Sequence, residues 1–308
     1  MKPQLKDLDE LRTFVQVVDS GGLTAAGRVL GLPTNVVSRR LARLEDRLGV
    51  PLAIRTTRHL EPTAEGRRLH QRARSILDEV DEAEAELRGL DADLHGELRL
   101  GIPTRLATWI RPALRRFLER YPEVALQLFV TDRPPPLVLG DIASHGLDAA
   151  VLVGVVPPGP HIVRRLGQLS LRLAASTKYL TAHGRPRRVA DLSRHNCLSF
   201  IGLGVQTHWT LVDRRGDEVE VAIRSRFAAS DSRALLDALL DGIGVGIIED
   251  GELNRHDALE PVLPSYRMAP LPIGLGYAAP RRRSRRIAAL HELLLGHAPL
   301  PFTAHEKT

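Results

Sequence analysis

The sequence predicts an α/β protein that begins with an all-α winged helix-turn-helix and continues into one long helix. Three observations support this prediction. Two short helices and a longer one, joined by a turn containing Gly31 and Pro33, fit residues 1–62. Apolar residues then recur at spacings of three and four along residues 63–94, as in a coiled coil. Strands and helices alternate over residues 95–301, and residues 302–308 form a tail.

The composition allows sizeable hydrophobic cores and more than one domain. Of the 308 residues 43% are hydrophobic, and the net charge is +6, which favours a polyanionic partner only weakly. Cys197 is the only cysteine, so an internal disulfide and a cysteine-based zinc site are excluded. The polar N-terminus lacks a signal-peptide core, and no stretch of about 18 apolar residues occurs. We therefore expect a cytoplasmic protein without a membrane span.

The first two helices are predicted from apolar and small residues. The first has its apolar positions on one face, at Leu8, Leu11, Phe14, Val15 and Val18. The second covers residues 23–30 and contains Ala25, Ala26 and Gly27, whose small side chains let another helix cross closely. Pro33 suits the start of the third helix.

The third helix has one buried side and one polar side. Its apolar stripe consists of Val37, Leu41, Leu44 and Leu48. The other side carries Ser38, Arg39, Arg43 and Arg47, with Thr34 and Asn35 on the first turn. A helix that buries one side and presents Ser, Asn and Arg on the other suits the major groove of DNA.

A basic hairpin follows the third helix. Residues 54–60 lie between Pro51 and Pro62, and we interpret them as a β-wing. Arg55 and Arg58 are predicted to contact phosphate, the alternative being a solvated loop. The complete set of predicted DNA contacts is Thr34, Asn35, Ser38, Arg39, Arg43, Arg55, Thr57 and Arg58.

The long helix carries a heptad seam. Its apolar positions alternate spacings of four and three, at Leu69, Ala73, Ile76, Val80, Ala83, Leu87 and Leu90. A seam this narrow needs a partner helix, so we expect a dimer rather than a lone solvated helix. Basic residues gather in the first half of the helix, where their charge opposes the helix macrodipole. We therefore expect the start of this helix to face DNA.

The remaining elements alternate along the chain. Strands are predicted over residues 97–102, 124–130, 147–153, 169–176, 197–201, 210–212, 219–223, 226–228, 243–248 and 273–278. Helices are predicted over residues 106–120, 232–240 and 284–295, and residues 133–136 are predicted to be a stiff proline loop.

The chain resembles the LysR-type transcriptional regulators. The N-terminal motifs that carry the resemblance occur in order and without gaps, at Phe14, Thr24-Ala25-Ala26, Leu30, Val37-Ser38-Arg39, Leu44-Glu45, Leu48-Gly49, Arg55-Thr56-Thr57-Arg58 and Thr63-Ala64-Glu65-Gly66. Departures from the family pattern are Gly22 in place of Ser, Thr34 in place of Gln or Pro, and Ala53 in place of Phe. Landmarks of the family's effector domain match at Gly146-Leu147-Asp148, residues 179–184, Asp191-Leu192 and residues 242–246.

The resemblance implies a sequence-specific regulator that binds double-stranded DNA, is not an enzyme and needs no cofactor. It implies a periplasmic-binding-protein-like effector domain, in which two lobes joined by two crossing strands hold a small-molecule effector in a cleft. Lobe one would comprise residues 95–165 and 268–301, and lobe two residues 166–267. The resemblance also implies a homodimer or homotetramer and contact with RNA polymerase. It leaves open the effector, the target genes and the choice between activation and repression.

Four residues are candidate effector contacts: Thr104, Ser199, Phe200 and Ser230. Thr104 and Ser230 precede predicted helices, where they either cap the helix or bind an anion. Asp231 would repel an anion, so we expect a ligand with at most one carboxylate. Ser199 and Phe200 end a strand at the expected cleft, and the alternative for both is ordinary strand packing.

Other chemistry is weakly supported. The glycines of residues 242–246 enter a strand, whereas a dinucleotide fingerprint opens a helix. His195 and Cys197 have no identifiable third group for nucleophilic catalysis, and the histidines lack metal-ligand spacing. The arginines of residues 281–286 are interpreted as solvated surface, with a second DNA or anion contact as the alternative. The rival classes are a DNA-coating protein without regulation, an α/β enzyme and a solute-binding protein.

Overall fold

The computed structural model describes residues 7–55, 60–87, 94–144, 146–203 and 206–296. The predictions for Thr57, Arg58, Leu90 and the tail therefore lie outside the described residues. The chain forms two compact units. The first unit is residues 1–93 with the short segments 143–146 and 283–285, and the second unit is the remainder.

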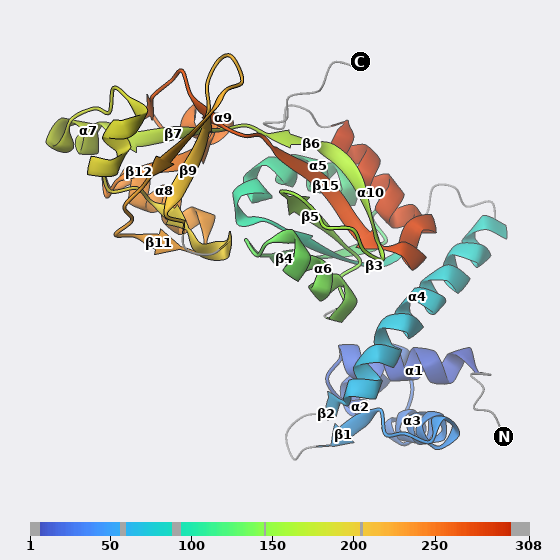
Figure 1. The fold of residues 1–308 in the computed structure, drawn as a ribbon. Helices are drawn as coiled ribbons and strands as arrows, with labels where there is room; N and C mark the ends of the chain where they lie inside the picture. Colours follow the sequence, from blue (N-terminus) through green and yellow to red (C-terminus); the bar gives the residue numbers. More distant parts are fainter. Residues whose placement is uncertain (1–6, 56–59, 88–93, 145, 204–205, 297–308) are drawn as a thin grey trace. The chain divides into compact units, whose positions relative to one another are not determined.

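The first unit contains the predicted helices and hairpin (Figure 1). Its elements are α1 (Leu8–Asp19), α2 (Leu23–Leu30), α3 (Thr34–Leu48), β1 (Ala53–Arg55), β2 (Leu60–Pro62) and α4 (Ala64–Leu87). The strands β1 and β2 pair antiparallel. Phe14, Val17, Val37 and Leu44 have no exposed surface and form the centre of the core beneath the three short helices. The apolar spacing predicted this packing correctly at Leu11, Phe14, Val37 and Leu44, but it was wrong at Leu8, which is exposed, and it missed Val17.

Local signals set the ends of these helices. The Asp7 side chain accepts the Asp9 N–H at the start of α1 at 2.9 Å, a standard N-cap bond. Gly31 ends α2 and Gly49 ends α3, both in the left-handed conformation that glycine adopts without steric cost. The Thr63 hydroxyl accepts the Gly66 N–H at 2.9 Å and caps α4.

The second unit contains two lobes, each built on its own sheets (Figure 1). The sheet of lobe one has five strands in the order β4-β3-β5-β15-β6. Their bounds are β3 (Gly96–Ile102), β4 (Val124–Val130), β5 (Ala149–Val153), β6 (His161–Leu169) and β15 (Leu271–Ala278). The helical elements of this lobe are η1 (Thr104–Leu106), α5 (Ala107–Arg120), α6 (Pro135–Ser144), η4 (Ala279–Arg283) and α10 (Arg285–Leu295).

Lobe two is built from three smaller sheets. The first has the order β12-β7-β13, from β7 (Leu171–Ser176), β12 (Val245–Glu249) and β13 (Leu259–Val262). The second has the order β10-β9-β14, from β9 (His208–Val212), β10 (Glu218–Ala222) and β14 (Arg267–Met268). The third pairs β8 (Ser199–Phe200) with β11 (Ala228–Ala229), in parallel. The helical elements are α7 (Thr177–His183), η2 (Val189–Arg194), η3 (Ile201–Leu203), α8 (Ser232–Leu240) and α9 (Asp250–Leu253).

The chain passes between the two lobes twice. The first passage follows β6, which ends at Leu169, and β7 begins at Leu171 in the sheet of lobe two. The second passage lies between β14, which ends at Met268, and β15, which begins at Leu271. The first change of lobe thus comes a few residues later than the position expected from the sequence.

Several segments differ from the sequence predictions, including α7, α9 and β13, which were not predicted, and two of the differences have a clear physical reason. The predicted proline loop is wrong from Pro135 onward, because Pro135 and Pro136 form the first turn of α6. Proline is tolerated there, since the first N–H groups of a helix need no intrahelical partner. The strand β6 was not predicted, because its sequence HIVRRLGQL is too polar to show alternation and most of its residues are not buried.

Candidate DNA-contacting surface and ligand cavity

Most residues on the predicted polar side of α3 are exposed. Thr34, Asn35, Arg39 and Arg43 are exposed, and Ser38 is half-buried. On the opposite side Val37, Leu41 and Leu44 are at most 3% exposed. The helix therefore presents two hydroxyls, an amide and two guanidinium groups on one continuous surface. These are the groups that hydrogen-bond base edges and phosphates.

Close helix packing holds α3 in place. A Cβ at Gly27 of α2 would lie 2.6 Å from the backbone oxygen of Leu32, closer than atoms can approach. The Leu32 N–H donates to the Gly27 carbonyl at 2.9 Å, which closes the turn between the two helices. The glycine thus lets the α2–α3 turn fold tightly against α2, and this turn sets the direction of α3.

Two arginines of α3 are used inside the first unit. Arg47 was predicted to lie on the exposed polar side, but it is paired with Glu10 of α1, whose side chain is 4% exposed. Arg40 pairs with Asp9 at 3.1 Å and also donates to the Thr13 hydroxyl. These ion pairs tie α3 to α1, so they leave Arg39 and Arg43 as the arginines of α3 that face outward.

The start of the wing is fixed by one carboxylate. Glu45 Oε1 accepts the N–H groups of Leu52 at 2.7 Å and Ala53 at 3.1 Å. The Thr63 N–H donates to the Leu52 carbonyl at 3.0 Å and joins the other end of the hairpin to the same point. Arg55 ends β1, and residues 56–59, which include the predicted contacts Thr57 and Arg58, are outside the described residues.

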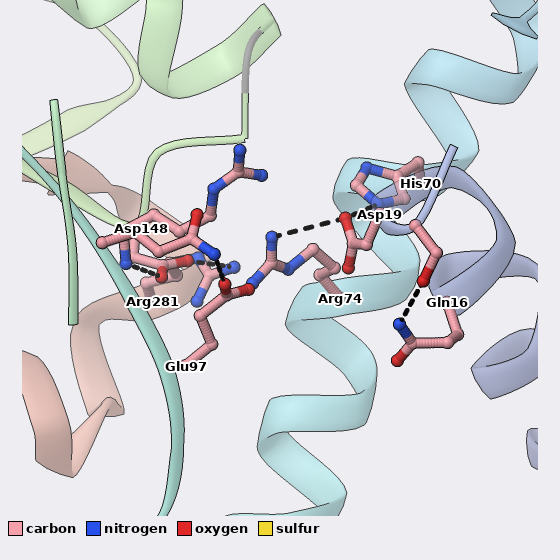
Figure 2. A network of polar contacts seen from close by, with 10 residues as sticks. Gln16, Asp19, His70, Arg74, Glu97, Asp148 and Arg281 are labelled. Carbon is pink, nitrogen blue, oxygen red and sulfur yellow. Dashed lines mark hydrogen bonds and ion pairs between the residues drawn. The ribbon is translucent and has the colours of Figure 1, made fainter. Parts of the chain in front are cut away.

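A polar cluster joins α4 to α1. Figure 2 shows Asp19, at the end of α1, beside His70 and Arg74 of α4. His70 Nε2 lies 2.8 Å from Asp19 Oδ1, and Arg74 Nη1 lies 3.8 Å from the same oxygen. The side chains of His70 and Arg74 are both 9% exposed. The long helix is therefore anchored to the helix-turn-helix by buried polar groups as well as by apolar contacts.

The first part of the predicted dimer seam packs within the chain instead. Ala73 has no exposed surface and lies with Leu77 against Leu11 of α1. Leu69 packs against the same cluster and against the core of the helix-turn-helix. The seam prediction is therefore wrong at Ala73, because α1 covers this face of α4, whereas Leu69 is only partly buried. Ile76 is 39% exposed and Val80 is half-buried, and the side chains of Ala83 and Leu87 are outside the described set.

A cavity of about 380 Å³ opens between the two lobes of the second unit. Most of its wall is apolar, including Pro103, Val151, Leu198, Phe200 and Trp209. The charged groups that line it are Arg105, Asp132 and Arg133. A cavity of this size with a mainly apolar wall and a few polar groups is typical of a small-molecule site.

Of the four predicted effector contacts, only one lines this cavity. Phe200 lines it, as predicted. Thr104 instead lines a neighbouring cavity of about 230 Å³, together with Ser232. Ser199 is completely buried in its strand, as its alternative of ordinary strand packing proposed. Ser230 is exposed and lines neither cavity, and the α8 cap is Asp231, whose side chain accepts the Ala234 N–H at 2.8 Å.

Asp132, which follows β4, was not predicted as a site residue. Its Oδ1 accepts the Thr104 N–H at 2.8 Å, and its Oδ2 accepts the Ser232 N–H at 2.6 Å. Thr104 begins η1 in lobe one, whereas Ser232 begins α8 in lobe two. Asp132 therefore joins two helix starts in different lobes. Arg105 adds a second link between the lobes, through an ion pair of 2.7 Å with the buried Glu249.

The arginine run of residues 281–286 is only partly solvated. Arg281 is 10% exposed and pairs at 2.8 Å with Asp148, whose side chain is 2% exposed; both residues are labelled in Figure 2. Arg286 is buried and donates to the carbonyl oxygens of His95 and Glu97. The predicted solvated surface is therefore wrong for Arg281 and Arg286, because the buried Asp148 beside β5 and backbone carbonyls at the start of β3 bind them. Arg282 is exposed.

His195 and Cys197 do not form a reactive pair. Burial raises the pKa of the Cys197 thiol to about 12, which keeps it protonated at neutral pH. The His195 ring bonds the Tyr179 hydroxyl through Nδ1 at 3.2 Å, and burial lowers its pKa. A protonated thiol without an adjacent base is a poor nucleophile. Among the described residues, no group of three His, Cys, Asp or Glu side chains is placed to hold a metal ion.

No helix in the described part of the chain has the length and apolar character needed to cross a bilayer.

Two family models match the chain. The model described as a bacterial regulatory helix-turn-helix protein of the lysR family matches residues 8–67. The model described as a LysR substrate binding domain matches residues 91–299.

Individual proteins are similar along most of their length. The transcriptional regulator CrgA of Neisseria meningitidis is 32% identical over 243 residues, which is 79% of each chain. The transcriptional activator AaeR of Escherichia coli is 31% identical over 87% of this chain and 86% of its own. The structure of CrgA, titled a LysR-type transcriptional regulator, covers 95% of this chain and 99% of its own with a TM-score of 0.59 and 28% identity.

Proposed function

Because this chain belongs to the LysR family of DNA-binding transcriptional regulators, we propose that α3 is the helix that reads base sequence in the major groove. The observation that carries the proposal is the contrast between its two sides. Val37, Leu41 and Leu44 are buried, while Thr34, Asn35, Arg39 and Arg43 are exposed. Helix-turn-helix proteins place such a polar side against base edges.

Within this surface we assign different tasks to different residues. Arg39 and Asn35 have side chains that form paired hydrogen bonds with base edges, guanine for arginine and adenine for asparagine. Thr34, Ser38 and Arg43 complete the contact surface. Arg55, Thr57 and Arg58 of the wing contact the phosphate backbone, which adds affinity without sequence information.

The protein acts as a homodimer or homotetramer through α4. Ile76 and Val80, whose side chains are not buried in the chain, begin the surface that meets the partner helix, and Ala83, Leu87 and Leu90 continue it. Two copies of α3 then read two half-sites of an imperfect palindrome. The contact with RNA polymerase is proposed from the family alone.

The cavity between the lobes is the effector site. Its volume of about 380 Å³ and its apolar wall support this assignment, and Phe200 is the predicted contact that lines it. A ligand bound there shifts the balance between two arrangements of the oligomer by binding one of them more tightly.

Selection of bound duplexes from a random-sequence library tests the proposed function. The full chain should enrich one sequence with two related half-sites in inverted orientation. Enrichment of no sequence, or a footprint that covers any DNA equally, would mean that the chain coats DNA without reading it. The same selection supplies the duplex needed for the experiments described below.

A further inference from the structure

The carboxylate of Asp132 lies where the N–H groups of two helical elements converge. One oxygen is 2.8 Å from the backbone nitrogen of Thr104 and the other is 2.6 Å from that of Ser232. The two nitrogens belong to different lobes and are joined by this side chain alone among the described hydrogen bonds. Each oxygen of the carboxylate has therefore one fixed donor.

This geometry is the one a ligand carboxylate would need. The first N–H groups of a helix have no partner within the helix, and its N-terminus favours negative charge. At α8 two acidic side chains already satisfy this requirement, since Asp231 accepts the Ala234 N–H while Asp132 accepts the Ser232 N–H. An anionic ligand at this edge of the cavity would have to displace Asp132 or lie beside its charge.

The rest of the cavity wall contains few groups that could bind an anion. Asp132 lines the cavity together with Arg105 and Arg133. The Arg105 guanidinium is already paired with Glu249 at 2.7 Å, and Arg133 is exposed to solvent. The remaining wall is mainly apolar, with Thr131, Gln206, His208 and Thr210 as further groups that can form hydrogen bonds. Such a wall favours an apolar body with one or two hydrogen-bonding groups.

We propose that the cavity between the lobes takes an uncharged, largely apolar small molecule, and that Asp132 is the residue that excludes carboxylate ligands. The proposal rests on the assignment of this cavity as the effector site and names the class of its ligand. Asp132 is then a built-in substitute for the ligand carboxylate, which already links the two lobes before any ligand binds.

A pair of probes that differ in charge tests the proposal. Binding of 1-naphthol and 1-naphthoate to the full chain is measured at neutral pH by isothermal titration calorimetry. The rings are the same, but the first probe is neutral and the second is an anion. We expect 1-naphthol to bind at least tenfold more tightly. Equal or tighter binding of 1-naphthoate would overturn the proposal, and so would the failure of both probes to bind.

Variants connect the preference to Asp132. Asp132→Ala frees both backbone donors, and the ratio of the two affinities should shift toward 1-naphthoate by at least tenfold. Asp132→Asn keeps the side-chain volume and removes the charge, so a smaller shift in the same direction is expected even where the alanine variant folds poorly. An unchanged ratio in the asparagine variant would contradict the role of Asp132.

Asp213 provides a matched control. Its carboxylate also accepts two backbone N–H groups, from Arg215 at 2.7 Å and Asp217 at 3.0 Å, but it does not line this cavity. Asp213→Ala should leave the ratio of the 1-naphthol and 1-naphthoate affinities unchanged. A shift as large as that of Asp132→Ala would mean that removing any carboxylate of the chain has this effect. DNA binding is measured on the same samples. If the unmodified chain does not bind DNA sequence-specifically, the proposed function is wrong. If it binds DNA sequence-specifically but prefers 1-naphthoate to 1-naphthol, only the proposed ligand class is wrong.

Discussion

Gly66 connects the wing to the long helix, and its replacement by alanine should destabilise the first unit. A Cβ on Gly66 would lie 1.9 Å from the Leu52 oxygen and 2.9 Å from the Leu52 carbonyl carbon. Both are backbone atoms, and the same oxygen accepts the Thr63 N–H at 3.0 Å. The backbone at Leu52, just before β1, must therefore move before an alanine can fit.

The size of the effect follows from two opposing contributions. Alanine in place of glycine stabilises a helix by up to about 1 kcal/mol. Overpacking a well-packed site costs about 1–3 kcal/mol and sometimes more. A 1.9 Å approach to backbone atoms belongs at or above the upper end of that range. The net loss is then about 2 kcal/mol, which corresponds to a fall in Tm of about 8–16 °C for a domain of this size.

Differential scanning calorimetry of the full chain measures this change, and DNA titration measures its consequence. The transition of the first unit should move down by the stated amount, and DNA affinity should fall because the wing is displaced. Gly140→Ala is the control, since Gly140 lies in α6 and an added Cβ there meets no atom within 4 Å. The alanine should be neutral or slightly stabilising at Gly140. If the first unit of the Gly66→Ala protein melted within about 2 °C of its Tm in the unmodified chain, the predicted clash with the Leu52 backbone would be wrong.

Three further predictions concern other parts of the chain. Cys197 should resist a thiol-specific reagent in the native protein and react only after unfolding, since burial raises its pKa to about 12; rapid labelling of the folded chain would contradict this. Burial lowers the pKa of His195 in the folded chain, so as the pH falls the unfolded chain takes up the His195 proton at a higher pH than the folded chain does. Stability should therefore fall as the pH drops below about 6.5. Urea titrations at several pH values should show a shallower fall for His195→Gln. Ile76→Asp and Val80→Asp should abolish the oligomer in sedimentation experiments, whereas Ile54→Asp, at a similarly exposed residue of the wing, should leave it intact; an unchanged oligomer in the Ile76 and Val80 variants would remove α4 as the interface.

The helical first unit was predictable because its signals are local. The apolar residues from Val37 to Leu48 recur at regular spacing within one helix. Gly31, which ends α2, directly follows the residues that form that helix. The seam on α4 was misjudged at Ala73 for the opposite reason. The spacing correctly identified an apolar face, but only the folded chain shows that α1 covers it.

The cavity between the lobes was less predictable because it is built from distant segments. Asp132 reaches Thr104 across 28 residues of sequence and Ser232 across 100. No spacing rule connects three such positions, and an aspartate followed by Arg133 and three prolines is typical of a turn. Phe200 was identified from its position at a strand end, whereas Ser230 was misplaced because the neighbouring Asp231 caps α8.

Base reading by α3 is tested by the effect of Arg39→Ala on binding to two duplexes, the selected site and a scrambled sequence of equal length. If α3 reads bases, the loss of one base contact weakens binding to the selected site by about 1–3 kcal/mol, or about 5- to 150-fold, and leaves the scrambled duplex nearly unaffected. Arg115→Ala is the control, since Arg115 is an exposed arginine of α5 paired with Glu119, and it should change neither affinity. Equal weakening on both duplexes by Arg39→Ala, or no weakening on either, would contradict the assignment of α3 as the reading helix.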